Sequence, residues 1–255
     1  MKLAIMQPFV FPYIGYFQAI NAVDKYILYD RLNYIKKKWM NRNRILIVNR
    51  DPCYFVIPLK EKSSYKKIYQ IQLEPSNSWR SKILNQVNYN YKKSPFFSEV
   101  FPLIEKVILF ETDLLHELNN QSIIETCNYL EIKTIIGADA SVYDEIEEKL
   151  NYYEDDLPSG YPNIYLYPMV KKIIRVLEIC RYEKADHFIN AIGGTKLYSK
   201  EDFLRNGITL NFIQTKDYRY KQNSDKFFSG LSIIDVLMNC GKEQTRKLLD
   251  EYDLI

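Results

Sequence analysis

The sequence predicts an α/β protein: a Rossmann-like parallel sheet core flanked by helices, with an additional β-hairpin and a helical C-terminal part. Short apolar runs alternate with segments of helical spacing towards both ends of the chain. The first residues, up to Tyr29, show a strand, a loop, a helix and a second strand. Such a unit joins parallel strands through a crossover helix, and the alternation of helices and strands predicts a three-layer architecture.

Each element of the first half follows from a local pattern. Apolar runs that end at proline or a charged residue predict strands, and apolar residues three or four positions apart predict helices. The turn at Asn49–Pro52 predicts a hairpin between two of the runs. We expect strands at Leu3–Met6, Tyr26–Tyr29, Ile45–Val48, Tyr54–Leu59, Ile68–Leu73 and Ile132–Ile136, and helices at Ile14–Val23, Trp79–Tyr91, Phe96–Leu109 and Leu114–Leu130.

The second half begins with a stretch of different composition. Glu145–Tyr167 mixes acidic residues with prolines and a glycine, which predicts a linker or mobile loop. We therefore expect a Rossmann-like nucleotide-binding domain over residues 1–145 and a C-terminal α/β part over 146–255 that completes the same site. After the linker we expect a helix at Met169–Arg181, a strand at His187–Asn190, a turn at Gly193–Gly194, a helix through Phe203, a strand at Ile208–Phe212, and helices at Ile233–Asn239 and Lys242–Glu251.

Composition excludes several classes of protein. The net charge of +3 is too small for a general nucleic-acid binder, so any basic patch must be local. The four cysteines are widely scattered, which argues against a zinc site or a disulfide framework and favours a reducing compartment. The two histidines exclude a His-rich metal site. No apolar run is long enough to span a bilayer and no signal peptide is apparent, so we expect a cytoplasmic protein.

The loop Gln7–Tyr16 is the first candidate ligand site. It follows the first strand, and in open α/β sheets ligands bind at the carboxyl ends of the strands. Two prolines stiffen the loop, and Gly15 at the helix start allows a ligand to approach the backbone. Free N–H groups of a first helical turn suit a phosphate. The alternative is that the loop aromatics belong to the core and the glycine is a packing contact.

A basic, aromatic segment follows the second strand. Arg31–Arg44 contains six basic residues interleaved with asparagines and aromatic residues. Arginine and asparagine supply directional donors for phosphate oxygens, and Tyr34 or Trp39 offers a stacking surface for a base or sugar ring. A run of charge is usually only a solvated face, but the Trp39–Arg44 core is less easily explained in that way.

Other candidates are weaker. His187 precedes a short strand and is more often structural, and Cys53, beside Pro52 in a turn, is a weak candidate nucleophile. Gly193–Gly194 could form a phosphate-contacting turn. Asp235 could cap or orient another group, and Ser232 is an ordinary helix N-cap.

The motifs resemble those of the WbqC-like family, whose genes lie among bacterial surface-polysaccharide (O-antigen) genes. The resemblance is carried by Gln7–Gln18, by Asp30, by Asn33-Tyr34 with Lys36-Lys37, and by Trp39–Ile45. Segments around Arg175, Phe188–Gly194, Gly207 and Leu231–Asp235 are also similar, so the resemblance covers nearly the whole chain. Residues 218–222 depart from the family pattern, where we expect a more proline-rich segment.

A second resemblance concerns the reaction. Tyr13-Ile-Gly-Tyr16 occupies the position where adenylate-forming enzymes of the "HIGH" type, such as pantothenate synthetase and class I aminoacyl-tRNA synthetases, carry His-x-Gly-His. Tyrosine hydroxyls could donate the same hydrogen bonds without a positive charge, which basic residues of the following segment would supply. The lysine signature of those enzymes is not visible, so the similarity is partial.

These resemblances imply a transferase that attaches an amino acid such as glycine to the amine of a nucleotide-linked amino sugar. The implied catalytic residues are Tyr13, Tyr16, Asp30, Lys37 and Arg42. The implied substrate- or nucleotide-binding residues are Gln7, Pro8, Gly15, Gln18, Asn33, Tyr34, Lys36, Trp39, Asn41, Asn43, Arg44, Gly193 and Gly194.

The donor system stays open at this stage. An acyl adenylate formed from ATP with Mg is one route, with no tightly bound cofactor expected. An aminoacyl-tRNA donor is the second, and it is the one case in which we expect a nucleic-acid partner. A non-catalytic nucleotide-sugar binding protein is the third alternative. We expect no membrane insertion, and a homodimer is one arrangement that the sequence allows.

Overall fold

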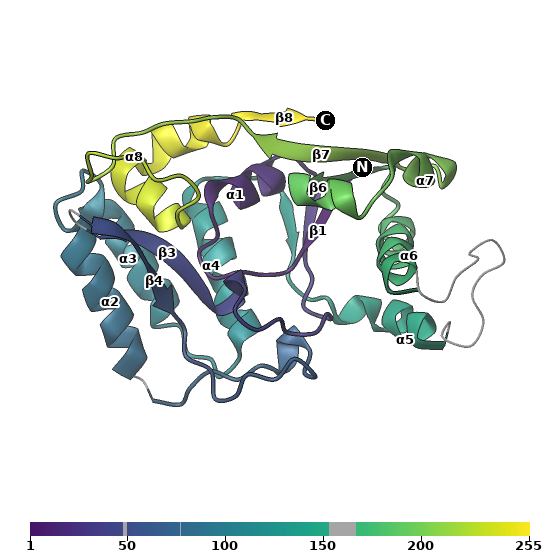
Figure 1. The fold of residues 1–255 in the computed structure, drawn as a ribbon, viewed down its shortest axis with the longest axis horizontal. Helices are drawn as coiled ribbons and strands as arrows, with labels where there is room; N and C mark the ends of the chain where they lie inside the picture. Colours follow the sequence, from purple (N-terminus) through teal and green to yellow (C-terminus); the bar gives the residue numbers. More distant parts are fainter. Residues whose placement is uncertain (48–49, 77, 153–166) are drawn as a thin grey trace.

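A mostly parallel sheet lies at the centre of the computed structural model, which describes residues 1–47, 50–76, 78–152 and 167–255 (Figure 1). Within these residues the sheet has six strands in the order β5-β2-β1-β6-β7-β8, and neighbouring strands are parallel except for β7 and β8. The strands are β1 (Lys2–Met6), β2 (Lys25–Leu28), β5 (Ile135–Gly137), β6 (His187–Ala191), β7 (Thr209–Thr215) and β8 (Tyr252–Leu254). The predicted fold class is therefore confirmed, and both predicted parts of the chain contribute strands to one sheet.

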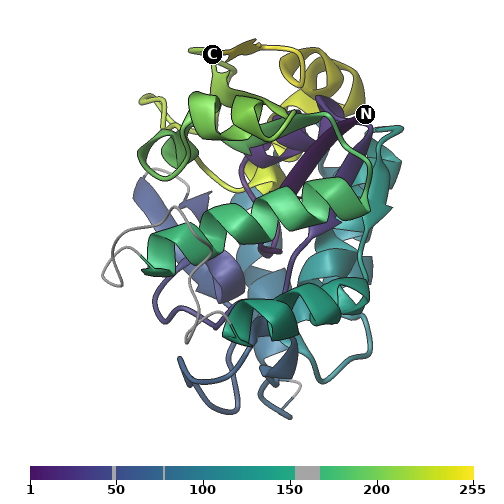
Figure 2. The same cartoon turned by 90° about the vertical axis from the view of Figure 1, so that its right-hand side faces the viewer.

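Helices cover both faces of this sheet. Along β1 and β2 the side chains alternate: Ala4 and Leu28 pack into one hydrophobic core, and Leu3 and Ile27 into the other. The first core faces α1, α4 and α8, and the second faces α5, α6 and α7, which lie over the sheet in Figure 2. The helices are α1 (Ile14–Asn21), α2 (Ser78–Tyr91), α3 (Phe97–Ile108), α4 (Leu115–Tyr129), α5 (Asp144–Tyr152), α6 (Tyr167–Tyr182), α7 (Lys200–Arg205) and α8 (Ile233–Leu248).

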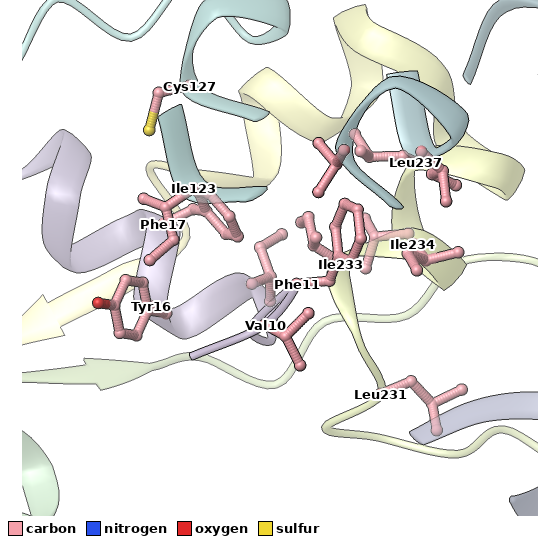
Figure 3. Close-up of a cluster of buried hydrophobic side chains, with 14 of the residues drawn as sticks. Val10, Phe11, Tyr16, Phe17, Ile123, Cys127, Leu231, Ile233, Ile234 and Leu237 are labelled. Atoms are coloured by element: carbon pink, nitrogen blue, oxygen red, sulfur yellow. The ribbon is translucent and has the colours of Figure 1, made fainter. Parts of the chain in front are cut away.

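The larger core fixes the loop that follows β1. Val10 and Phe11 are fully buried and point among side chains of α1, α4 and α8, with Phe17, Ile123 and Ile233 around them (Figure 3). Burial of side chains of this size stabilises the fold by about 1.5–3 kcal/mol each. The burial of Val10 and Phe11 therefore anchors the loop to the larger core.

The β-hairpin predicted around Asn49–Pro52 is formed by β3 (Arg42–Ile47) and β4 (Arg50–Val56), which are antiparallel. It begins earlier than expected, because the last residues of the basic segment, Arg42–Arg44, form the start of β3. One face of the hairpin is buried through Asn43 and Phe55, and the other presents alternate side chains to solvent.

Several predicted elements are corrected. Ile68–Leu73 is not a strand, because Ile68–Gln70 forms a 3₁₀ turn with a reciprocal Lys67–Gln70 cap, and only isolated bridges follow. Part of the predicted linker forms α5, and its residues 153–166 lie outside the described residues. The two predicted C-terminal helices are confirmed: they share the label α8, but the backbone at Gly241 (φ +63°) is not helical and divides them between the two predicted ranges. Strand β8 is an element that the sequence did not predict.

Candidate functional site

One turn of α4 holds both predicted site segments. The Nδ2 of Asn119 donates to the backbone carbonyls of Pro8 (3.0 Å) and Met40 (2.9 Å). Three residues further on, the hydroxyl of Ser122 accepts a hydrogen bond from the backbone N–H of Phe11 (3.1 Å). The loop after β1 and the turn before β3 therefore lie side by side, although some thirty residues separate them in the sequence.

Asn43 joins the same two segments from the other side. Its side chain is 4% exposed, and its Nδ2 donates to the carbonyls of Phe11 (2.7 Å) and Val10 (3.3 Å). Its Oδ1 accepts from the backbone N–H of Arg44 (2.8 Å). All these polar groups are thus used within the protein, so Asn43 positions the loop.

The two segments enclose a cavity of about 230 Å³, which we call the loop pocket. Tyr13 and Trp39 are 40% and 39% exposed, so each presents part of its ring to solvent. Burial raises the pKa of Tyr13, so its hydroxyl stays protonated and can donate a hydrogen bond. The pocket is lined by Phe9, Pro12, Tyr13, Trp39, Asn43 and Gly230.

Cations and aromatic rings alternate on the outer face of the hairpin beside this pocket. The guanidinium of Arg42 lies 4.7 Å from the ring centre of Tyr54, and that of Arg44 lies 5.8 Å from the ring of Trp39. The two rings are themselves 6.0 Å apart. We call these four residues the arginine–aromatic row. The row places fixed positive charge beside Trp39, which lines the loop pocket.

The two arginines of the row also bind backbone carbonyls. Arg42 donates to the carbonyl of Lys37, and Arg44 donates to the carbonyl of Gly230 (3.3 Å). Lys36 and Lys37 are exposed next to the row. Arg42, Arg44 and the neighbouring Lys37 therefore lie together, whereas Arg31 of the same basic segment pairs with Asp144 elsewhere.

Other predicted site residues lie beneath the loop. Tyr16 is 1% exposed and its hydroxyl donates to the carbonyl of Gln7 (3.0 Å). Gln18 is fully buried and donates to the carbonyls of Leu248 (2.8 Å) and Glu251 (3.1 Å). Both side chains hold α1 to its surroundings and do not reach the loop pocket.

Gly15 packs closely against the loop. A Cβ at this position would come within 2.4 Å of the Tyr13 ring and 2.7 Å of the Thr215 hydroxyl. The absent side chain thus lets Tyr13 fold back over the start of α1.

Tyr34, Asn41 and Asn33 brace the turn before β3. The hydroxyl of the buried Tyr34 donates to the Oδ1 of Asn41 (3.0 Å), whose Nδ2 donates to the carbonyl of Ile57 (2.8 Å). Asn33 is exposed and forms an isolated bridge with Lys67. These contacts shape the segment from which Trp39 projects.

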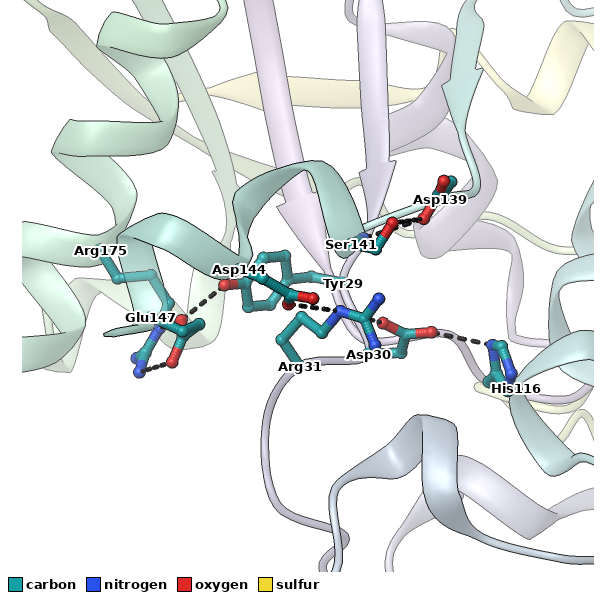
Figure 4. Close-up of polar contacts among 9 residues, drawn as sticks. All are labelled: Tyr29, Asp30, Arg31, His116, Asp139, Ser141, Asp144, Glu147 and Arg175. Atoms are coloured by element: carbon teal, nitrogen blue, oxygen red, sulfur yellow. Dashed lines mark hydrogen bonds and ion pairs between the residues drawn. The ribbon is translucent and has the colours of Figure 1, made fainter. Parts of the chain in front are cut away.

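Asp30 lies at the end of β2 in a buried ionic cluster (Figure 4). It is 2% exposed, and its Oδ2 lies 2.8 Å from the Nδ1 of His116, while its Oδ1 lies 3.7 Å from the Nε of Arg31. Arg31 also pairs with Asp144 (3.0 Å). A carboxylate that faces an imidazole and a guanidinium does not fit Mg²⁺, which prefers several oxygen ligands.

His116 was not among the predicted site residues. It lies at the start of α4, more than eighty positions from Asp30. A long-range pair of this kind has no local signal in one sequence.

A second cavity, of about 350 Å³, lies where β1 and β6 end; we call it the sheet-edge crevice. Gly193 and Gly194, in the turn after β6, line it together with Gln7. Arg175 of α6 also lines it, but this guanidinium forms a bidentate pair with Glu147, with 2.9 Å from Nη2 to Oε2. The hydroxyl of Tyr29 donates to Glu147 as well (2.5 Å).

Within the described residues, no group of three or more His, Cys, Asp or Glu side chains could hold a metal ion. In the same part of the chain, every helix is too short or too polar to cross a membrane.

Comparison with known proteins identifies the family. The profile of the WbqC-like protein family matches residues 7–247, nearly the whole chain. The chain belongs to the WbqC-like protein family. This membership supports a role related to polysaccharide biosynthesis. The chain is also 25% identical over 244 residues to "Uncharacterized protein Rv1507c" of Mycobacterium tuberculosis, with 95% of each chain covered. No solved structure matches.

Proposed function

We propose that this WbqC-like protein is a transferase that attaches an amino acid, such as glycine, to the amino group of a nucleotide-linked amino sugar. The observation that carries the proposal is the convergence of the loop after β1 and the Trp39–Arg44 segment on the loop pocket. An apolar, aromatic-walled cavity with arginines next to its Trp39 wall suits a ligand that has a ring at one end and phosphates beside it.

The size and walls of the pocket favour a single sugar ring. A volume of about 230 Å³ is below the range of about 300–1,000 Å³ for sites that enclose a drug-sized ligand. The partly exposed faces of Tyr13 and Trp39 can pack against the apolar face of a sugar. The pyrophosphate would then lie along Arg42 and Arg44, which cannot lose their charge.

In this reaction the protein has to position the two substrates, and it does not have to supply a nucleophile. The unprotonated sugar amine attacks the carbonyl carbon of an activated amino acid, a C–N bond forms, and the bond from carbon to the leaving phosphate breaks. With an aminoacyl adenylate the products are the amide, AMP and one proton. Tyr13 can donate to the oxyanion that develops, and the basic residues hold the phosphates.

A direct assay tests the proposal. The protein is incubated with UDP- or dTDP-linked amino sugars, ATP, Mg²⁺ and a panel of amino acids that begins with glycine. Mass spectrometry should show an aminoacylated nucleotide sugar, and AMP should accumulate in step with it. If neither appears across the panel, adenylate-dependent transfer is wrong.

Two substitutions separate catalysis from binding. Tyr13→Phe removes one hydroxyl, and we expect kcat to fall about 100-fold, as for loss of one oxyanion donor. Tyr89→Phe is the matched control, because Tyr89 is 69% exposed on α2, away from the pocket. Arg42→Ala should lower kcat/KM about 10- to 100-fold, since a charge-assisted hydrogen bond contributes about 1.5–3 kcal/mol.

An aminoacyl-tRNA donor is the second candidate, favoured by the exposed Lys36, Lys37 and Lys38 beside the arginine–aromatic row. It requires tRNA in the assay and makes product formation independent of ATP. A binding protein without catalysis is the third alternative, in which Tyr13→Phe and Arg42→Ala change only the affinity for the nucleotide sugar.

A further inference from the structure

The sheet-edge crevice lies at the point where the order of the strands reverses. From β1 the chain moves to β2 on one side, and after β5 it returns to β6 on the other side of β1. The crevice is lined by residues that end β1 and β6, such as Met6 and Ala191. Connections that leave in opposite directions open a crevice at this edge, and ligands of open α/β sheets bind there.

Three of the residues that line this crevice carry polar groups without partners. Within the described residues, the side-chain amide of Gln7, the Nδ2 of Asn190 and the hydroxyl of Tyr198 form no hydrogen bond, although all three residues line the cavity. Asn190 uses only its Oδ1, which accepts from the backbone N–H of Ala191 (2.8 Å). Two amides and a hydroxyl are suitable partners for the heteroatoms of a base and the hydroxyls of a ribose.

The charge of the crevice is weakly positive and lies at its rim. Arg175 is 8% exposed and is neutralised by Glu147, which also accepts from Tyr29. Lys172 is the one charged residue among the described lining residues that has no ion-pair partner, and it is exposed. The remaining walls are largely apolar, with Ile5, Val176 and Leu197 among them. This arrangement suits a neutral planar group inside and a negative group at the entrance.

The two glycines after β6 differ in a way that supports a ligand. A Cβ on Gly194 would lie 2.6 Å from the Nδ2 of Asn190 and 3.2 Å from the Phe212 ring, so packing explains that glycine. Gly193 has no atom within 4 Å of an added Cβ and does not have a positive φ. Neither packing nor backbone conformation requires a glycine there, and the open space beside it is room that a ligand can occupy.

We propose that the sheet-edge crevice binds a nucleoside phosphate, with the nucleoside against the apolar wall and the phosphate near Lys172. Its part in the reaction, as the nucleotide of the activated acyl donor, rests on the proposed function, whereas the binding itself does not. Gln7 lines the crevice and Phe9 lines the loop pocket, so Pro8 alone separates the two along the chain. Donor and acceptor would meet at this segment.

Calorimetric titration of the full chain with ATP, AMP and adenosine tests the site. We expect Gly193→Val to weaken ATP binding at least about tenfold, because its side chain fills space that the ligand needs. A melting curve like that of the wild type should show that the variant is folded, since the site has room for the methyl groups. Lys172→Ala should weaken ATP and AMP binding but not adenosine binding. Lys196→Ala is the matched control for Lys172→Ala. Lys196 is also an exposed lysine and belongs to the turn that holds Gly193, but it does not line the crevice.

Two results would overturn the proposal: no ATP binding by the wild-type protein, or wild-type ATP affinity in folded Gly193→Val. Trp39→Ala in the loop pocket should leave ATP affinity unchanged. If Trp39→Ala weakened ATP binding as much as Gly193→Val does, the crevice would not be a separate site. The two proposals fail differently. If ATP binding depends on Gly193 while no aminoacyl product forms, the crevice stands and the proposed reaction is wrong.

Discussion

Removal of the Asp235 carboxylate is expected to destabilise the protein more than any surface substitution. Asp235 is fully buried in the first turn of α8. Its Oδ2 accepts from the hydroxyl of Tyr91 (2.7 Å), and its Oδ1 accepts from Tyr220 (2.6 Å) and Gln222 (3.1 Å). Through these bonds it joins α2 and the segment before Gly230 to α8.

The magnitude follows from the donors that would be left. In Asp235→Ala the hydroxyls of Tyr91 and Tyr220 lose their acceptor, while Gln222 still donates to the carbonyl of Phe228 (2.9 Å). An unsatisfied buried donor costs about 1–3 kcal/mol, so two give about 2–6 kcal/mol. Relief of a buried charge offsets part of this, and we expect a net loss of about 3 kcal/mol. For a chain of this size that lowers Tm by about 6–12 °C.

The pH dependence gives a sharper test. Burial raises the pKa of Asp235, so the folded state binds its proton more tightly than the unfolded state. The stability that this group contributes is therefore greatest below the unfolded carboxyl pKa of about 4 and decreases as the pH rises through the folded value. Asp235→Asn keeps the shape and cannot titrate, so its destabilisation relative to the wild type should shrink as the pH rises.

Urea denaturation of the wild type, Asp235→Asn and Asp235→Ala, at roughly pH 4 and pH 7, measures both effects. A loss under about 1 kcal/mol for Asp235→Ala, or a difference for Asp235→Asn that grows with pH, would refute the reasoning.

Three further predictions concern stability. Burial raises the pKa values of Tyr16, Tyr26 and Tyr91, so the stability that these groups contribute is complete below about pH 10 and should be lost as the pH rises further. Tyrosinate absorbance should increase together with the loss of circular dichroism; ionisation of these tyrosines while the circular dichroism stays that of the folded protein would contradict this. Gly241→Ala should cost about 3 kcal/mol in urea denaturation, because φ is +63° and the Cβ would lie 2.4 Å from the Phe96 ring; Gly193→Ala, in open space, is the control. His116→Ala should cost about 2 kcal/mol by leaving Asp30 with Arg31 at 3.7 Å, and should cost clearly less in an Asp30→Asn background; equal costs would show that the two residues are not coupled.

The sequence predicted what short-range patterns determine. The apolar runs Leu3–Met6 and Tyr26–Tyr29, with a helix between them, could form little other than a buried parallel unit, and β1 and β2 pair as expected. The alternation in Ile68–Leu73 was misleading. The N–H of Ile68 donates to the carbonyl of Leu32 (2.9 Å) in the segment that precedes β3. Single tertiary hydrogen bonds of this kind take the place of the regular hydrogen bonds of a strand.

The site was predictable in its segments but not in the direction of each side chain. Every residue from Ile14 to Ile20 is buried, so no polar face marks which side of α1 meets solvent, and the pattern could not place Tyr16 and Gln18 inside. The Arg175–Glu147 pair and the Asp30–His116 contact each join distant segments. A single sequence contains the residues of such pairs but not the distances between them.

The double hydrogen bond of Asn119 makes the walls of the loop pocket depend on each other. One amide nitrogen binds both Pro8 and Met40, so outward movement of either wall loosens the support of the other. A free amino sugar in the loop pocket and a nucleoside diphosphate along Arg42 and Arg44 beside it should consequently bind with positive cooperativity. The second fragment would meet walls that the first had already ordered, and the linked ligand would be held more tightly than the separate affinities suggest.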